Sequence, residues 1–429
     1  MGAWYWPSET GPALWLEPPD DTVLDRDCAR ARRLGVTELR LPLYWDAFAQ
    51  SARTLRAARV RDAERILEAA GRAGLGVVPV ALPLLLGRDA VLPRFAIDPG
   101  GRGARCLSGQ RVERGAPRDW FTDPGVQEAM VRHLEQLGQA FANHPALAAW
   151  EVVVGLTDLV RPSAPTLAAD LATLLVAAVR RTGDRVRWTL SGRECLRDQG
   201  LRPADLAPLV DELAVDPNGA AALLRPVLGG AAGAAAAVGE PGLPTFLGLL
   251  AAGLASRAVT PVGVARSTRP ADLDGAPDAS GGNDEAASLG WAQPAWAALA
   301  QLAATGGGVG AGPLLDAGPR CDALPYFRAN PGRRWLGLLG TDGKAKAWAW
   351  EAACALGADG PGRADAPEAV RTAPRARAGT GPQAALPSLA GLGDPQTFYS
   401  VPGAALDLAR PWLDAFRHWW LEAARSPAG

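Results

Sequence analysis

Short apolar runs alternate with helical patterns along most of this chain, and this alternation restricts the possible fold more than any other feature. The runs are rich in Val, Leu and Trp, and each ends at Gly, Pro or a charged residue. They lie at residues 3–7, 37–45, 75–83, 147–155, 185–192, 210–216, 259–266 and 307–315. Continuous apolar strands of this kind are typical of a parallel sheet that is covered on both faces.

The segments between the runs carry apolar residues at helical spacing. In the clearest segment, 123–143, Val126, Met130 and Leu134 share one face, and Asp123 offers an N-cap directly before a proline. Strand and helix alternate about eight times over roughly 350 residues, which predicts a (β/α)8 barrel. A doubly wound open sheet is the alternative, but we find no GxGxxG motif between a first strand and a helix.

Composition argues against several classes of partner. The 429 residues are 48% hydrophobic and 21% charged, with a net charge of −1, so neither nucleic acid nor an anionic membrane is expected. The Ala/Leu stretches are too short to span a bilayer, and no basic region precedes an apolar core at the N-terminus, so we expect a cytoplasmic protein. The five cysteines are scattered without CxxC spacing. We expect reduced thiols and no metal or cofactor, a disulfide or metal site being the alternative.

The C-terminal part of the chain differs in composition. Residues 357–395 are rich in Ala, Pro, Gly and Arg and have no apolar period, which is typical of a mobile linker. Residues 396–429 place Trp412, Phe416 and Trp419 at helical spacing. This pattern favours an extension that packs back on the barrel over a platform for stacking sugars. We therefore predict a barrel over residues 1–356, a linker over 357–395 and an extension over 396–429.

Several segments share their order and spacing with one group of sugar-cleaving enzymes. The opening "GAWYWP" resembles "GxNYWP", "HPALAAWEVVVG" resembles "HPAIAAWDLGNE", "SGRECLRDQGLRPADLA" resembles "HGEDLxRDxGIRPS", and "TPVGVARSTRP" resembles "KPVLFSEFGNP". Together they resemble clan A glycoside hydrolases of the cellulase- and mannanase-like kind in family 5. The likeness runs from residue 2 to about residue 355 and implies a (β/α)8 barrel with its site at the carboxyl ends of the strands.

The resemblance also implies two catalytic carboxyl groups about 5–5.5 Å apart, one an acid/base and the other a nucleophile. The acid/base Glu at the end of strand four aligns with Gly155, and the Asn before it aligns with Val154. The nucleophilic Glu of strand seven aligns with Arg266, or with Ala265 in a neighbouring register. Neither Gly nor Arg can form a glycosyl ester, and an arginine stays protonated at any working pH.

The expected sugar pocket is altered as well. Leu85 and Val91 stand where the group has a His and a Trp in the strand-three loop, and Asp216 and Asn218 replace the strand-six His and Tyr. Pro313 or Leu314 replaces the strand-eight Trp. Sugar sites need aromatic faces and many hydrogen-bonding groups. The candidate cleft residues are Arg40, Trp45, Val154, Gly155, Glu194, Asp216, Asn218 and Arg266.

Two functions of different classes follow from these positions. The favoured one is a glycosidase-like barrel that has lost hydrolysis and serves as a binding or assembly module, with a saccharide, a small anion or an unidentified protein as its partner. The alternative is an active glycosidase on a β-linked saccharide, with its carboxylates relocated to Glu194, Asp216, Asp158 or Asp316.

Each surviving polar residue also has a purely structural interpretation. Arg40 is interpreted as an inward arginine paired with a carboxylate, and Trp45 as part of the core. A salt bridge to Arg193 or Arg197 would account for Glu194. Asp158 and Asp216 are interpreted as solvated loop charges, which contribute little to stability.

Overall fold

Eight parallel strands form the centre of the molecule. The computed structural model describes residues 1–181, 185–196, 200–216, 258–262, 295–304, 308–329 and 331–357, a few positions between 245 and 255, and Pro367. The strands pair in the order β13-β12-β11-β10-β3-β2-β1-β14. Their bounds are β1 Gly2–Trp4, β2 Glu38–Pro42, β3 Gly76–Pro83, β10 Trp150–Val154, β11 Val186–Ser191, β12 Glu212–Asp216, β13 Val259–Pro261 and β14 Gly310–Pro313.

The sheet curves into a barrel, because its first and last strands in sequence lie next to each other. β1 pairs with β2 on one side and with β14 on the other. The two ends of the sheet order, β13 and β14, also approach each other, since the Gly308 N–H donates to Thr260 Oγ1 at 3.1 Å. The predicted (β/α)8 barrel is confirmed, and the open sheet is excluded.

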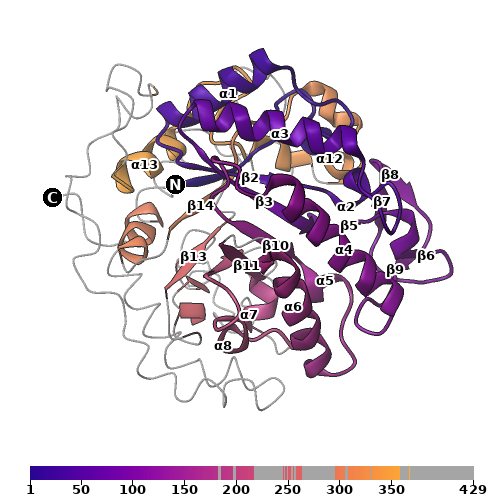
Figure 1. Ribbon diagram of the computed structural model, residues 1–429. Helices are drawn as coiled ribbons and strands as arrows, with labels where there is room; N and C mark the ends of the chain where they lie inside the picture. Colours follow the sequence, from indigo (N-terminus) through magenta and orange to yellow (C-terminus); the bar gives the residue numbers. More distant parts are fainter. Residues whose placement is uncertain are drawn as a thin grey trace, which may run out of the picture.

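Helices cover the outside of the barrel (Figure 1). The longer ones are α1 Asp21–Arg33, α3 Ala57–Arg72, α4 Pro124–Phe141, α6 Pro165–Arg180 and α13 Ala347–Ala355. Asp123 caps α4 as predicted, accepting hydrogen bonds from the backbone N–H groups of Gly125 and Val126. Residues 295–303 are helical, within the predicted helix 284–304. No helix among the described residues is long and apolar enough to cross a membrane.

Short elements follow the strands at their carboxyl ends. They comprise α2 Trp45–Phe48, α5 Leu156–Leu159, α7 Gly192–Leu196, α8 Pro203–Leu206, α12 Pro325–Ala329 and the 3-10 turns η1 Gly11–Ala13, η2 Arg94–Ala96, η3 Pro319–Ala323 and η4 Pro331–Trp335. The loop after β3 forms a small sheet of β4 Leu85–Leu86, β5 Asp89–Val91, β7 Cys106–Ser108 and β8 Arg111–Glu113, beside the pair β6 Ile97–Asp98 and β9 Ala116–Pro117. The predicted linker and extension beyond residue 357 lie outside the described residues, Pro367 apart.

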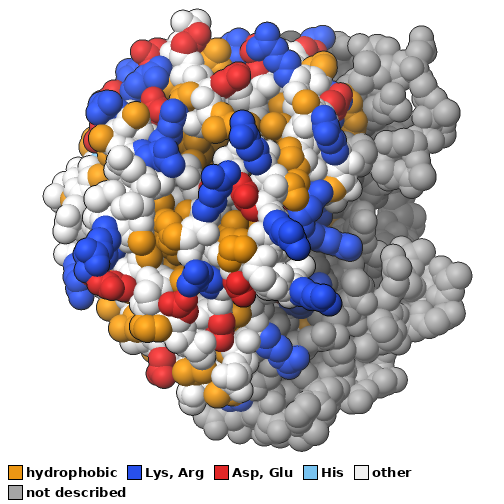
Figure 2. Space-filling model, turned by 90° about the vertical axis from the view of Figure 1, so that its right-hand side faces the viewer, with side chains coloured by type: hydrophobic (Ala, Val, Ile, Leu, Met, Phe, Trp, Pro, Cys, Tyr) orange, Lys and Arg blue, Asp and Glu red, His pale blue; other side chains and the backbone are white. Residues whose placement is uncertain are grey.

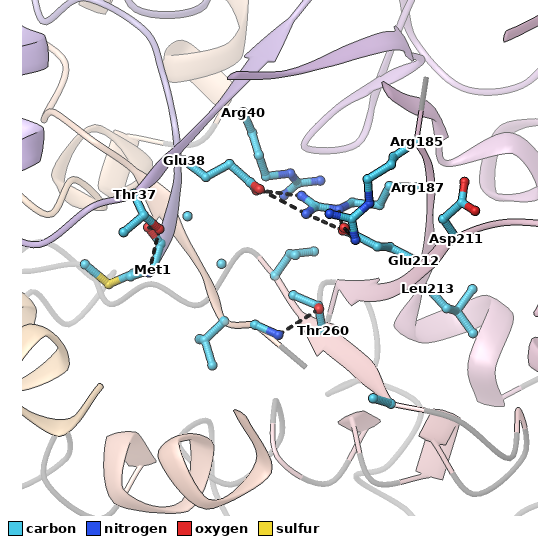
Figure 3. Close-up of a pocket in the computed structure, with 16 residues that line it drawn as sticks. Met1, Thr37, Glu38, Arg40, Arg185, Arg187, Asp211, Glu212, Leu213 and Thr260 are labelled. Atoms are coloured by element: carbon cyan, nitrogen blue, oxygen red, sulfur yellow. Dashed lines mark hydrogen bonds and ion pairs between the residues drawn. The ribbon is translucent and has the colours of Figure 1, made fainter. Parts of the chain in front are cut away.

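Ion pairs in the barrel interior join both neighbouring and non-adjacent strands. Near the amino ends of the strands, Arg187 donates to Glu38 at 2.6 Å and to Glu212 at 2.7 Å. Figure 3 shows these side chains projecting toward a cavity of about 440 Å³ at this end. One level further along, Arg40 and Glu151 form a two-point ion pair with both side chains fully buried. Charged layers therefore link β2, β10, β11 and β12 from within.

Candidate functional site

The carboxyl ends of the central strands bring several predicted site residues to one rim of the barrel. Val154 and Ser191 end β10 and β11, and Asp216 ends β12 in register with Ser191. The loop after β3, with β5, β7 and β8, extends from this end of the barrel on the right of Figure 1. Figure 2 shows that Lys and Arg side chains are spread over this face among apolar and acidic ones. This rim is where a barrel of this kind places its active site.

Gly155, directly after β10, sits in a conformation that few other residues adopt. Its φ of 82° lies in the left-handed region, and the residue serves as the N-cap of α5. A Cβ atom built on Gly155 would lie 2.3 Å from Leu85 Cδ1. Both the backbone and the packing of Leu85 therefore oppose any side chain at the position expected for the acid/base carboxyl group.

Glu194, on α7, takes part in a buried hydrogen-bond network, while Arg197, one of the two arginines suggested as its salt-bridge partner, lies outside the described residues. Glu194 Oε1 accepts from the Thr157 hydroxyl at 2.6 Å and the Thr157 backbone N–H at 3.2 Å. Its Oε2 accepts from the Ser191 backbone N–H at 2.8 Å. The Ser191 side chain also hydrogen-bonds Asp158. The network ties the loop after β10 to the end of β11.

Burial raises the pKa of both acids in this network. Burial, and then the nearby charge of Asp158, raises the pKa of Glu194 to about 7. Burial also raises the pKa of Asp158, against the hydrogen bond from Ser191 and the charge of Arg193. One Asp158 oxygen, Oδ1, is buried and has no hydrogen-bond partner among the described residues. A carboxyl group with a pKa near 7 could act as a general acid, but only where a substrate can touch it.

The other candidate carboxylates are held by the fold. Asp316, after β14, is fully buried, and its Oδ1 accepts from Lys346 Nζ at 2.7 Å. Asp216 is 8% exposed, so its interpretation as a solvated loop charge is wrong. Its negative charge acts on Arg333, which donates to the hydroxyl of Tyr326 at 3.3 Å.

Two more candidates belong to the interior, as interpreted from the sequence. Arg40 lies inside the barrel, where Glu151 is its carboxylate partner. Trp45 is 1% exposed and packs edge-on against Phe95. Asn218 and Arg266 lie outside the described residues. Within the part of the chain that the structure describes, no group of three His, Cys, Asp or Glu side chains is placed to hold a metal ion.

Comparison with known proteins shows which molecules share this architecture. No family model and no curated protein matches the chain. A GH5_18 structure from Streptomyces cattleya, in complex with Manβ1-4GlcNAc, is 21% identical over 83% of this chain and 79% of its own, with a TM-score of 0.60. A GH5_18 structure from Bifidobacterium longum subsp. infantis is 18% identical over 83% of this chain and 77% of its own, with a TM-score of 0.64.

This chain has the fold of the family 5 glycoside hydrolases. An exo-β-1,4-mannosidase from Opitutaceae bacterium strain TAV5 also has a similar structure, with 17% identity over 83% of this chain and 58% of its own and a TM-score of 0.58. Identities at this level establish the glycoside-hydrolase fold and leave the activity open. The resemblance seen in the sequence is thereby confirmed as a likeness of fold.

Four residues of this glycoside-hydrolase fold were missed by sequence reasoning. Thr157 and Ser191 bind Glu194, while Tyr326 and Arg333 lie near Asp216. Thr157 and Ser191 could have been identified from the sequence, because each is a polar residue close to the end of an apolar run, where parallel strands place their site residues. Tyr326 and Arg333 lie more than a hundred residues from Asp216 in sequence, and no local pattern connects them.

The raised pKa of Glu194 gives a testable pH dependence of stability. A group whose pKa is raised by folding favours the folded state below its unfolded pKa, near 4.3 for Glu. That contribution is lost as the pH rises through the folded value of about 7. The free energy of unfolding of the parent protein should fall by on the order of 3 kcal/mol between pH 4.5 and 8, since one pKa unit corresponds to about 1.36 kcal/mol. We expect this fall to be absent in Glu194→Gln.

The measurement is urea unfolding of both proteins across this pH range, reading the difference in the free energy of unfolding. The amide offers only one acceptor oxygen, but this cost is the same at every pH and leaves the slope unaffected. Glu128→Gln, at an exposed carboxylate paired with Arg132, is the control and should leave the slope between pH 4.5 and 8 unchanged. Parallel curves for the Glu194→Gln and parent proteins would contradict the prediction.

Proposed function

We propose that this barrel has lost glycoside hydrolysis and acts as a saccharide-binding module. One observation carries the proposal. At the end of β10, where the acid/base carboxyl group would project, Gly155 has no side chain, its backbone is left-handed, and Leu85 occupies the adjacent space. Hydrolysis requires a group that protonates the leaving oxygen while a carboxylate meets the oxocarbenium-like carbon.

Relocated carboxylates are a weaker explanation, because two of the four candidates, Glu194 and Asp316, are held by interactions within the fold. Both oxygens of Glu194 accept hydrogen bonds, and the side chain is 1% exposed, so it has no route to a glycosidic oxygen. Asp316 is neutralised by Lys346. At the nucleophile position, the sequence has Arg266 in place of a carboxylate. A fixed positive charge there would oppose the positive charge that develops in the transition state.

Saccharide binding is supported by the architecture and by the proteins that share it. Solved GH5_18 structures from Streptomyces cattleya hold Manβ1-4GlcNAc and GlcNAc. Loss of the catalytic pair removes the chemistry but does not by itself remove affinity, because binding and transition-state stabilisation rest on different contacts.

The proposal predicts no turnover of aryl β-glycosides by the purified protein. The panel is the p-nitrophenyl β-mannoside, β-glucoside, β-galactoside and N-acetyl-β-glucosaminide, followed by release of p-nitrophenol against a buffer blank. We expect rates equal to the blank for every substrate, since no described carboxyl group is placed as an acid/base at β10.

A parallel calorimetric titration with Manβ1-4GlcNAc tests binding, and we expect saturable heat. Robust turnover that Asp216→Asn or Glu194→Gln abolishes would replace the proposal with an active glycosidase using relocated carboxylates. Absence of both turnover and binding would remove the saccharide from the proposal.

A further inference from the structure

A second cavity lies on the same face as the strand ends, at its edge. It has a volume of about 260 Å³, is open to solvent on one side, and is lined by the segment after β1, by α2, by the start of α3 and by the turn between β7 and β8. The lining side chains that matter here are Trp15, Leu16, Asp46, Arg56, Arg59 and Gln110. Ligand pockets are commonly about 300–1,000 Å³ and mostly apolar, with a few polar groups. This cavity suits a ligand of one sugar ring.

The turn that forms one wall is fixed in place from two sides. Gly109 and Gln110 have φ values of 58° and 60°, as in the type I′ turns of tight hairpins. The left-handed conformation is unfavourable for Gln and persists only where the surroundings hold it. Here Asp46 Oδ2 accepts from the Gly109 N–H at 2.6 Å, and Gln110 Nε2 donates to the Pro12 carbonyl at 3.4 Å. The wall is therefore preformed.

Two acceptor atoms on these side chains have unused capacity. Asp46 Oδ1 and Gln110 Oε1 are both buried and have no hydrogen-bond partner in the described part of the chain. Each buried polar atom left without a partner costs roughly 1–3 kcal/mol. A ligand hydroxyl or an ordered water supplies the missing hydrogen in such positions. The terminal torsion of Gln is soft, so its oxygen can adjust toward a ligand.

The charges around the cavity decide the class of ligand. The guanidinium group of Arg56, whose charge acts on Asp46, disfavours a cation there, while Arg59 is paired with Asp62. The carboxylate of Asp46 in turn disfavours an anion. A neutral polyhydroxylated ring satisfies both, because each hydroxyl donates to one group and accepts from another. Leu16, 54% exposed at the edge, offers apolar surface for the C–H face of a ring.

We propose that this cavity is a saccharide subsite that binds one sugar ring through Asp46 and Gln110, separate from the barrel mouth. This subsite proposal rests on the proposed function, because both take a saccharide as the ligand. It adds the place where the saccharide binds. Burial raises the pKa of Asp46 to about 6, so the carboxylate is mainly ionised at pH 7.5 and mainly protonated at pH 5. Affinity should therefore fall at the lower pH.

The test is titration of the full chain with mannose and with GlcNAc, followed by calorimetry and by ligand-observed NMR at pH 7.5. Asp46→Asn keeps an oxygen for Gly109 but loses the charge, and Gln110→Gly keeps the left-handed backbone while removing the amide. We expect affinity for at least one sugar to fall about 10-fold in Asp46→Asn and about 5-fold in Gln110→Gly. Arg111→Gln, at the next residue and outside the cavity lining, is the control and should change affinity less than about 2-fold.

Each outcome bears on the subsite separately from the loss of hydrolysis. Sugar binding that both variants retain overturns the subsite and leaves a saccharide-binding barrel whose ligand sits elsewhere. Failure of the folded parent protein to bind either sugar also overturns the subsite, whatever the glycoside panel shows. Turnover of the panel, together with the expected loss of sugar affinity in Asp46→Asn, overturns the proposed loss of hydrolysis and supports the subsite.

Discussion

Glu151→Ala is expected to lower the free energy of unfolding by about 3–5 kcal/mol, because it leaves a buried arginine without its counter-charge. Arg40 and Glu151 are both fully buried, and Arg40 Nε donates to Glu151 Oε2 at 2.8 Å. The hydroxyl of Thr189 also donates to Glu151, at 2.7 Å, and would lose its acceptor. Arg40 already has one buried nitrogen, Nη1, without a hydrogen-bond partner among the described residues, and its contact with the Trp4 ring, 4.1 Å from the ring centroid, is a weaker interaction than an ion pair with a carboxylate.

Urea unfolding at pH 7 measures this loss, with two controls. Arg40→Met combined with Glu151→Leu removes both charges and should recover most of the stability, since buried pairs can be replaced by apolar residues at little cost. Arg132→Ala breaks an exposed pair with Glu128 and should cost less than about 1 kcal/mol. A loss of under about 1 kcal/mol in Glu151→Ala would show that the pair contributes little to the barrel interior.

The arrangement of strands and helices was accessible from the sequence, because buried parallel strands must be continuously apolar and helices must carry an apolar face. The run 147–155 contains β10, and the predicted helix 123–143 contains α4 with its Asp123 cap. The inward arginine on β2 was predicted too. Its partner Glu151 could have been identified, since Glu151 is the one charged residue in an otherwise apolar run, and a strand with both faces covered must pair such a charge.

The details of the rim depend on contacts between distant segments, and sequence patterns do not specify these. Glu194 accepts hydrogen bonds from Thr157, because the loop after β10 folds over the end of β11. Asp216 is buried near Tyr326 and Arg333, which come from a segment beyond β14. The family resemblance aligns Gly155 with the acid/base position, but neither the left-handed backbone of Gly155 nor its contact with Leu85 can be inferred from an alignment.

Those two features predict that Gly155→Glu, the substitution that would restore the acid/base carboxyl group, destabilises the protein by about 2–4 kcal/mol. The φ of 82° costs a residue with a Cβ on the order of 1 kcal/mol or more. Displacing Leu85, whose Cδ1 would lie 2.3 Å from the new Cβ, adds an overpacking cost of about 1–3 kcal/mol. We also expect no turnover of aryl glycosides by this variant, since the sequence has Arg266 at the position that the family resemblance aligns with the nucleophile.

Alanine substitutions at two glycines separate the backbone cost from the packing cost. Gly74 has a φ of 71°, and no described atom lies within 4 Å of the place that a Cβ would take, so Gly74→Ala carries the backbone cost alone. Gly155→Ala carries the same backbone cost plus the clash with Leu85, and should be the more destabilising by about 1–3 kcal/mol in urea unfolding. Adding Leu85→Ala to Gly155→Ala should recover part of that difference, because the clashing atoms are gone, although a cavity limits the gain. Equal losses at Gly74 and Gly155 would mean that Leu85 moves aside freely, and the end of β10 could then accommodate a carboxyl group after all.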